Sequence, residues 1–212
     1  MTTKSVAALD ALKRLQKGND RFVENDRCAD TYLSHTNLEE HLDGQAPFAI
    51  ILSCSDSRVP VEIIFDVGLG DLFVVRVAGN IVSPTLVGSI ELAAEKFGPR
   101  LVVVMGHTGC GAVDVTLAAV ENEDPDPPDH VNSIVEAIKP AVIGAMAGID
   151  GKRATVLEAA VRANVRASVE ALRQGSAALE TLIRDDGLVV VGAEYSLETG
   201  EVDFFEGLPV ED

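Results

Sequence analysis

The sequence predicts an α/β fold with a central, mostly parallel sheet of four strands plus an antiparallel edge strand, flanked by helices. Apolar runs at residues 49–52, 72–77, 101–105 and 188–191 have the length of strands, and amphipathic segments separate them. These runs are almost continuously apolar, which is typical of a parallel sheet with helices on both faces. We therefore expect a single domain over residues 1–212, in which apolar residues make up 47%.

The beginning of the chain predicts a helix over residues 6–25. This segment precedes the first strand and has no obvious sheet face of its own. We therefore expect an N-terminal helical arm, residues 1–44, whose helix packs on a partner subunit, and an α/β core over residues 45–212. Apolar residues recur in the arm near helical spacing at Val6, Leu9, Leu12, Leu15 and Phe22.

Turn and helix signals predict the other elements in chain order. Proline suits the first turn of a helix, so a short helix is expected from Pro60 to Ile64. Residues 121–129 form an acidic, proline-rich loop, and residues 195–205 supply the closing edge strand. The remaining helices are expected at residues 38–42, 86–97, 112–120, 131–146 with a break or kink at Pro140, 155–173 and 177–183.

The formal net charge of −17 argues against nucleic acid and against anionic membrane surfaces as partners, because both need a basic face. No apolar run approaches the roughly 20 residues that span a bilayer, and the start of the chain lacks a signal-peptide pattern. We therefore expect a cytoplasmic protein. Three cysteines give no even disulfide framework, and Cys28 stands alone in a polar segment.

Three potential metal ligands follow two of the predicted strands. Cys54 comes soon after the first strand, while His107 and Cys110 follow the third strand at a spacing of three residues. If these strands are neighbours, the three side chains converge at the edge where open α/β sheets keep their chemistry. Two thiolates and an imidazole favour one Zn²⁺ ion per chain over magnesium or calcium, with a fourth position left for water.

Asp56 and Arg58 follow Cys54 closely enough to act on that water. Zinc lowers the pKa of bound water from about 15.7 to about 7, which yields hydroxide at neutral pH. Asp56 can accept the hydroxide proton and orient the oxygen while Arg58 holds the carboxylate off the metal; once released, Asp56 can become a fourth ligand. The plainer interpretation is a local cap and surface pair. Arg76, in the second strand, is either a buried arginine paired with a carboxylate or a residue near the active site.

The two motifs together resemble the beta-class carbonic anhydrases. They are Cys-Ser-Asp-Ser-Arg at residues 54–58 and Gly-His-Thr-Gly-Cys-Gly at residues 106–111, and the resemblance covers nearly the whole chain. It implies a zinc enzyme that interconverts carbon dioxide and bicarbonate through zinc-bound hydroxide oriented by an Asp56–Arg58 dyad. It also implies a homodimer, often a tetramer, with the active site at the subunit interface and the N-terminal helix on the partner.

The resemblance further implies three substrate-binding residues. Gln45 matches a glutamine that donates a hydrogen bond to the substrate from across the interface. Phe73 matches an aromatic wall of the carbon dioxide pocket, and Gly111 belongs to the second motif. Plainer interpretations stay open, with Phe73 as a core residue and Gln45 as a turn residue.

Two departures from the family pattern affect the pocket that the resemblance implies. Leu92 stands where many members have tyrosine, and Ala78 stands where many have a larger aliphatic residue. A branch of the family closes its aspartate onto zinc and binds a regulatory bicarbonate with a tryptophan. This chain has no tryptophan, which favours the branch whose site is open at neutral pH.

Three alternative functions remain at this point. The same scaffold supports hydrolysis of carbon disulfide or carbonyl sulfide. A nucleotide-binding module could use the glycines at 106–111, although their order is not that of a phosphate-binding loop. A non-catalytic zinc scaffold would have all four metal positions filled. The proton shuttle is not identified; its candidates, which titrate near neutral pH, are His35, His41 and His130.

Overall fold

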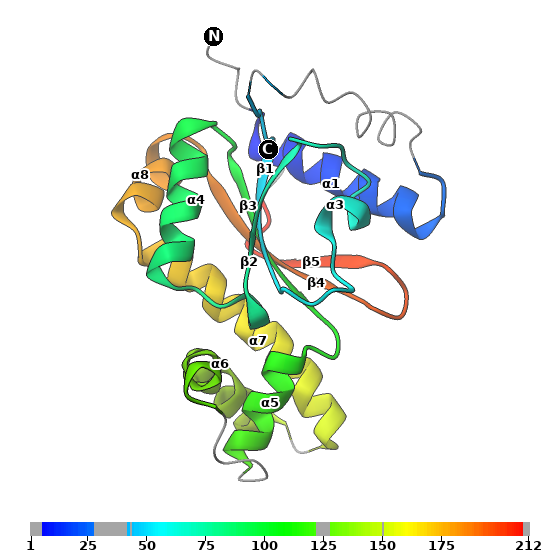
Figure 1. Cartoon of the computed structure of the whole chain (residues 1–212), viewed down its shortest axis with the longest axis vertical. Helices are drawn as coiled ribbons and strands as arrows, with labels where there is room; N and C mark the ends of the chain where they lie inside the picture. The colour runs from blue at the N-terminus through cyan, green and yellow to red at the C-terminus, as the bar shows by residue number, and fades with distance from the viewer. Residues whose placement is uncertain (1–5, 28–41, 43, 122–127, 150, 210–212) are drawn as a thin grey trace.

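A five-stranded sheet lies at the centre of the computed structural model, which describes residues 6–27, 42, 44–121, 128–149 and 151–209 (Figure 1). The strand order is β2-β1-β3-β4-β5. All neighbouring pairs are parallel except β4 and β5, which are antiparallel. This arrangement confirms the predicted fold class. The strands are β1 Ala49–Ser53, β2 Leu72–Arg76, β3 Leu101–His107, β4 Val189–Tyr195 and β5 Val202–Glu206.

Helices cover both faces of the sheet, as the continuous apolar runs predicted. Every residue of β1 and β3 is buried, and alternate side chains enter different cores. Ile51 and Val103 join one core, whereas Ile50 and Val102 join the core on the opposite face. On the first face lie α1 Ala8–Val23 and α3 Val61–Ile64; on the second lie α4 Pro84–Lys96, the C-terminal half of α7 Arg153–Gln174, and α8 Ala177–Asp185.

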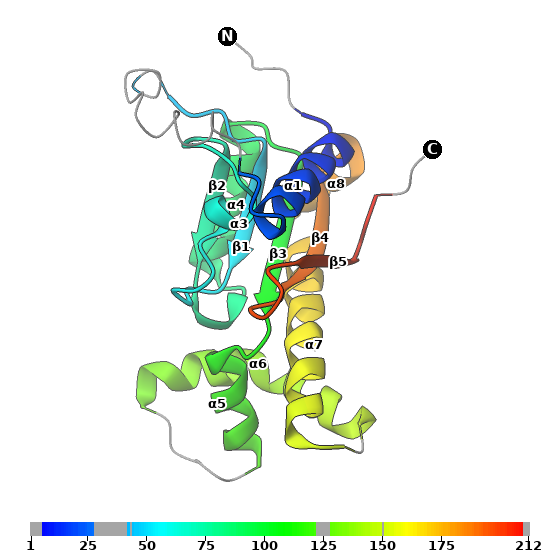
Figure 2. The ribbon, with the colours of Figure 1, turned by 90° about the vertical axis from the view of Figure 1, so that its right-hand side faces the viewer.

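A helical lobe extends beyond the sheet on the side where β1 and β3 end (Figures 1 and 2). It consists of α5 Gly111–Val120, α6 Asp129–Gly148 and the N-terminal half of α7, which share a third apolar core. Helix α6 continues through Pro140, so the break considered at this residue does not occur. Because α7 extends from this lobe onto the sheet, it packs in two cores at once.

Helix α1 packs on the sheet of its own chain, contrary to the expectation that it has no sheet face of its own. Ala11 and Leu15 are fully buried in the core formed with β1 and β3. The physical reason is that α3, on the same face, is only four residues long and leaves much of this face to be covered. Contact between the arm and a partner subunit, and the boundary at residue 44, stay predictions.

Some predicted features lie outside the described residues. These are Cys28, His35 and His41, nearly all of the helix expected at 38–42, and most of the loop expected at 121–129. Over the described residues, no helix combines the length and the hydropathy that crossing a membrane requires.

Leu15→Ala tests the packing of α1 on the sheet. The change should lower the free energy of unfolding by about 2–5 kcal/mol, because it leaves a cavity at a fully buried position. Urea unfolding followed by circular dichroism measures the loss. Val23→Ala, at an exposed position of the same helix, should change the free energy by less than about 0.5 kcal/mol. Equally small effects of both changes would show that α1 does not pack there.

Candidate metal centre

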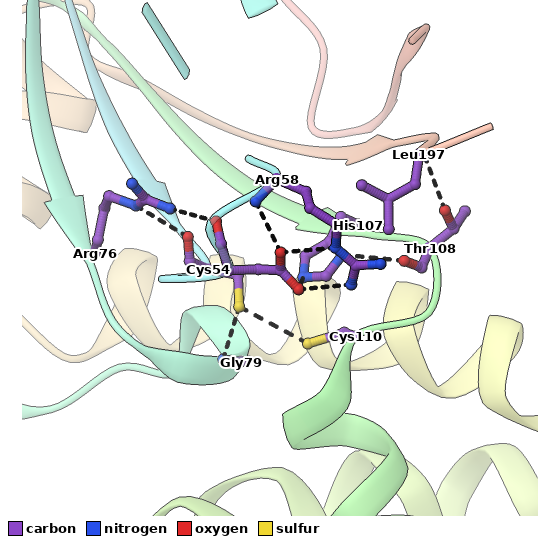
Figure 3. A network of polar contacts seen from close by, with 9 residues as sticks. Cys54, Arg58, Arg76, Gly79, His107, Thr108, Cys110 and Leu197 are labelled. Carbon is purple, nitrogen blue, oxygen red and sulfur yellow. Dashed lines mark hydrogen bonds and ion pairs between the residues drawn. The ribbon is translucent and has the colours of Figure 1, made fainter. Parts of the chain in front are cut away.

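The parallel pairing of β1 with β3 brings the three predicted ligands together. Ser53 pairs with Met105, so Cys54 and His107 emerge at the same edge of the sheet. Cys110 is the N-cap of α5, directly beyond β3. All three side chains are buried, and their ligand atoms lie within 4.8 Å of one another (Figure 3). The two sulfur atoms are 3.9 Å apart and form no disulfide.

His107 presents an unpaired nitrogen to this group. Its Nδ1 lies 3.0 Å from the carbonyl oxygen of Thr108, which can only accept, so Nδ1 carries the proton. Its Nε2 is buried without a hydrogen-bond partner. A buried polar nitrogen beside two sulfurs is costly unless something binds it. The donor set of one imidazole and two thiols therefore fits a zinc ion, with a fourth position not taken by these residues.

The contact between the two thiols shifts their pKa values in opposite directions. The hydrogen bond with Cys110 lowers the pKa of Cys54 to about 4, against the opposing effect of burial. The same contact, together with burial, raises the pKa of Cys110. Burial has the largest single effect on the pKa of His107 and lowers it, but the Cys54 sulfur, the Thr108 carbonyl and the Asp56 carboxylate together outweigh burial and raise that pKa. The two sulfurs therefore share one proton between them, and a metal ion must displace that proton to bind both.

Asp56 is held by three hydrogen bonds from Arg58. The backbone N–H and Nε of Arg58 donate to Oδ1 at 2.9 and 3.0 Å, and Nη2 donates to Oδ2 at 2.7 Å. These bonds hold the pKa of Asp56 well below its usual range, so the carboxylate stays ionised. Its Oδ2 lies 3.8 Å from Nε2 of His107, which places a fixed negative charge next to the candidate ligands.

Arg76 supports the segment that carries Cys54 and Asp56. Its Nε donates to the carbonyl of Cys54 at 3.1 Å, and its Nη2 donates to the carbonyl of Asp56 at 2.6 Å. The interpretation of Arg76 as a buried arginine paired with a carboxylate is wrong, because the residue is exposed and these acceptors are backbone carbonyls. It stands opposite Ser53 in the register of β1 and β2, which explains why it reaches the loop that follows β1.

The three predicted substrate-binding residues lie in different places. Gly111 begins α5 beside Cys110 and is exposed. Gln45 is also exposed but precedes β1, at the end of the strand opposite to Cys54. Phe73 is half-buried and packs on Phe97, 6.0 Å between ring centroids. It lies three positions before Arg76 in β2, which is about 10 Å along the strand. Within one chain, only Gly111 adjoins the metal-ligand group.

One contact to the centre was not anticipated from the sequence. The backbone N–H of Gly79 donates to the sulfur of Cys54 at 3.4 Å (Figure 3). Gly79 belongs to the one-turn helix η2 Ala78–Asn80. Its φ of +71° favours glycine, but no sequence signal gives the direction in which a backbone N–H points.

Comparison with known proteins identifies the family. The family model described as carbonic anhydrase matches residues 49–202. Carbonic anhydrase 2 of Mycobacterium tuberculosis is 40% identical over 199 residues, which cover 93% of this chain and 91% of that protein. A carbonic anhydrase of Mycolicibacterium smegmatis is 36% identical over 197 residues, 91% of each chain. The chain therefore belongs to the beta-class carbonic anhydrase family, and the predicted enzyme class is confirmed.

Solved structures share the fold at lower sequence identity. The beta-carbonic anhydrase of Coccomyxa, solved in complex with acetazolamide, has a TM-score of 0.73 and 24% identity, covering 92% of this chain and 86% of that one. A beta-carbonic anhydrase of Aspergillus fumigatus has a TM-score of 0.74 and 24% identity, covering 86% of each chain.

Cys110→Ala tests the metal centre directly. The variant should lose bound zinc, because two ligands and an open site hold the ion far more weakly than three. Mass-spectrometric metal analysis after gel filtration measures zinc per chain. Cys28→Ala, which removes the cysteine that stands alone in the sequence, should keep the wild-type zinc content. Full zinc in Cys110→Ala would contradict the assignment of this ligand.

Proposed function

We propose that this protein catalyses the reversible hydration of carbon dioxide to bicarbonate and a proton, with one Zn²⁺ ion per chain held by Cys54, His107 and Cys110. The observation that carries the proposal is the buried nitrogen of His107, unpaired and adjacent to two thiols, in a chain of this family. When bound, zinc supplies the Lewis acidity that turns water into a nucleophile near neutral pH.

The Asp56–Arg58 pair directs that chemistry. An ionised carboxylate can only accept hydrogen bonds, so Asp56 accepts the hydrogen of the attacking water and thereby orients an oxygen lone pair towards carbon dioxide. Arg58 occupies both carboxylate oxygens, which restrains Asp56 from turning onto the metal. Because Arg58 is 59% exposed at its side chain, its charge also reaches the solvent through which anionic bicarbonate leaves.

The apolar side of the site favours a nonpolar substrate. Cys54 and Cys110 belong to the same core as Ile81 and Val113, so the metal ligands stand between this apolar core and the polar dyad. Carbon dioxide has no net charge and no hydrogen-bond donor, and the polar groups needed to position it are few. We assign Gly111, next to Cys110, to the substrate side of this boundary.

We further propose a homodimer in which Gln45 and Phe73 serve the partner's site. Their distance from the ligands of their own chain supports this assignment, since a role in their own site would require them to lie near it. The exposed side of α1 would contact the partner. Two related enzymes of Sordaria macrospora are described as tetrameric, so a pair of such dimers is the larger assembly to look for. Buried free thiols at Cys54 and Cys110 suit a reducing cytoplasm.

Asp56→Asn tests the dyad. The amide cannot accept a proton and presents a donor at one position, so the carbon dioxide hydration rate should fall at least about 100-fold while zinc is retained. A stopped-flow assay with a pH indicator measures the rate. Asp203→Asn is the matched control, since Asp203 also pairs with an arginine, Arg162, at 2.7 Å. Unchanged turnover in Asp56→Asn would refute the role of the carboxylate.

The same assay decides the substrate. Carbon dioxide should be turned over by the zinc-loaded wild-type protein, and carbon disulfide and carbonyl sulfide are supplied in parallel. Turnover of either sulfur compound without carbon dioxide hydration would overturn the proposed reaction.

Mixed oligomers test the shared site. Cys110→Ala removes a metal ligand, and Gln45→Ala removes a substrate contact proposed to come from the other chain. In a heterodimer, the Gln45→Ala chain keeps its ligands and receives an intact Gln45 from its partner, which restores one complete site. After unfolding and refolding together, the mixture should exceed the mean activity of the two variants refolded separately. Activity equal to that mean would place Gln45 outside the partner's site.

A further inference from the structure

Cys54 depends on a turn that the rest of the chain must hold in place. The N–H of Gly79 donates to its sulfur at 3.4 Å, and both groups are buried. A hydrogen bond to a metal-binding thiolate fixes the position of the sulfur and shares its charge, which is how groups around a ligand adjust metal affinity. The direction of this N–H therefore bears on how well Cys54 binds a metal.

The backbone at this turn adopts unusual angles. Gly79 and Asn80 have φ values of +71° and +43°, both in the left-handed region. For a residue other than glycine this region is sparsely populated, and it persists where surrounding contacts impose it. The space around the turn is also tight, because a Cβ at Gly79 would lie 2.6 Å from Cδ1 of Ile138. Tertiary contacts must therefore hold the turn.

Helix α7 provides these contacts from its buried side. Nδ2 of Asn164 donates to the carbonyl of Gly79 at 2.7 Å, and Oγ of Ser168 donates to the carbonyl of Asn80 at 3.0 Å. The two side chains are four residues apart and so lie on one face of the helix. Both are almost fully buried, and they line a small cavity together with the apolar side chains of Ile81 and Val82. Burying a polar group costs free energy unless the group is hydrogen-bonded, so the two bonds to this turn account for the presence of Asn164 and Ser168 here.

We propose that Asn164 is a positioning residue for the metal ligand Cys54. It holds the carbonyl of the same residue, Gly79, whose N–H binds the sulfur. Asn164 thus acts on the metal centre across the backbone of one glycine, without touching the metal or the substrate. The inference rests on the proposed role of Cys54 as a zinc ligand. Ser168 supports the same turn one residue further on.

Asn164→Ala and Asn164→Asp test the proposal. Alanine removes the amide, while aspartate keeps its shape but offers no donor to the Gly79 carbonyl. In both variants the zinc dissociation constant, measured by competition with a chelator, should rise about 10-fold to 100-fold. In Co²⁺-substituted protein, the thiolate-to-cobalt charge-transfer band should shift or weaken, because one sulfur has lost its fixed N–H donor.

Asn19→Ala is the matched control. Asn19 is also a buried asparagine whose Nδ2 donates to backbone carbonyls, those of Ile64 and Gly200, but these contacts join α1 to α3 and to the β4–β5 turn. Its loss should reduce stability and leave zinc affinity and the cobalt spectrum at wild-type values. Ser168→Ala, a milder change, should shift both quantities in the same direction as Asn164→Ala but by less, and it serves if the Asn164 variants do not fold.

Two results would overturn the inference, and they are distinguishable. If the wild-type chain binds Zn²⁺ and Co²⁺ normally but the Asn164 and Ser168 variants match Asn19→Ala in affinity and spectrum, Asn164 has only a structural role. If the wild-type chain shows no thiolate-to-cobalt band, Cys54 is not a ligand, and the proposed function fails together with the inference.

Discussion

The parallel pairing of β1 with β3 is the constraint on which the rest of this protein depends. It fixes Cys54 relative to His107, and the short loop after β3 then brings Cys110 beside them. A slip of one residue would displace Cys54 by about 3.3 Å and exchange the side chains of the two cores. The fully buried strands resist such a slip, since each face has its own apolar cluster. The relative positions of Cys54, His107 and Cys110 are therefore fixed by the packing of the sheet.

The candidate site contains positively charged side chains, although the chain as a whole is strongly negative. The protein carries a formal net charge of −17, yet Arg58 and Arg76 both bind the short segment that contains Cys54 and Asp56. Arg58 balances the carboxylate, and Arg76 places positive charge against carbonyl oxygens beside the thiols. A reaction that turns a neutral molecule into an anion benefits from this local positive charge, which stabilises the anion as it forms. The net negative charge of the protein then repels the anion once it has left the site.

The order of residues predicted the sheet and the clustering of Cys54, His107 and Cys110, because both follow from local patterns. Apolar runs define strands, and ligands placed just after two adjacent strands must meet. The contacts of Arg76 and of α1 were harder to predict from the sequence, since they depend on which surfaces remain uncovered once the sheet has formed. The role of Asn164 could not be predicted, because it depends on the orientation of the two peptide groups that flank Gly79 and on a helix residue 85 positions further along the chain. The sequence shows only an asparagine within an amphipathic helix.

Helix α7 belongs to two cores, and this double membership restricts how the protein can change in evolution. Its N-terminal half is anchored among α5 and α6, and its C-terminal half lies on the sheet. Inserting or deleting a single residue between these halves would rotate one against the other by about 100°. After such a change, the buried side chains of α7 could not pack in both cores at once. Length variation among descendants of this chain should therefore gather in the connecting loops and spare the interior of α7.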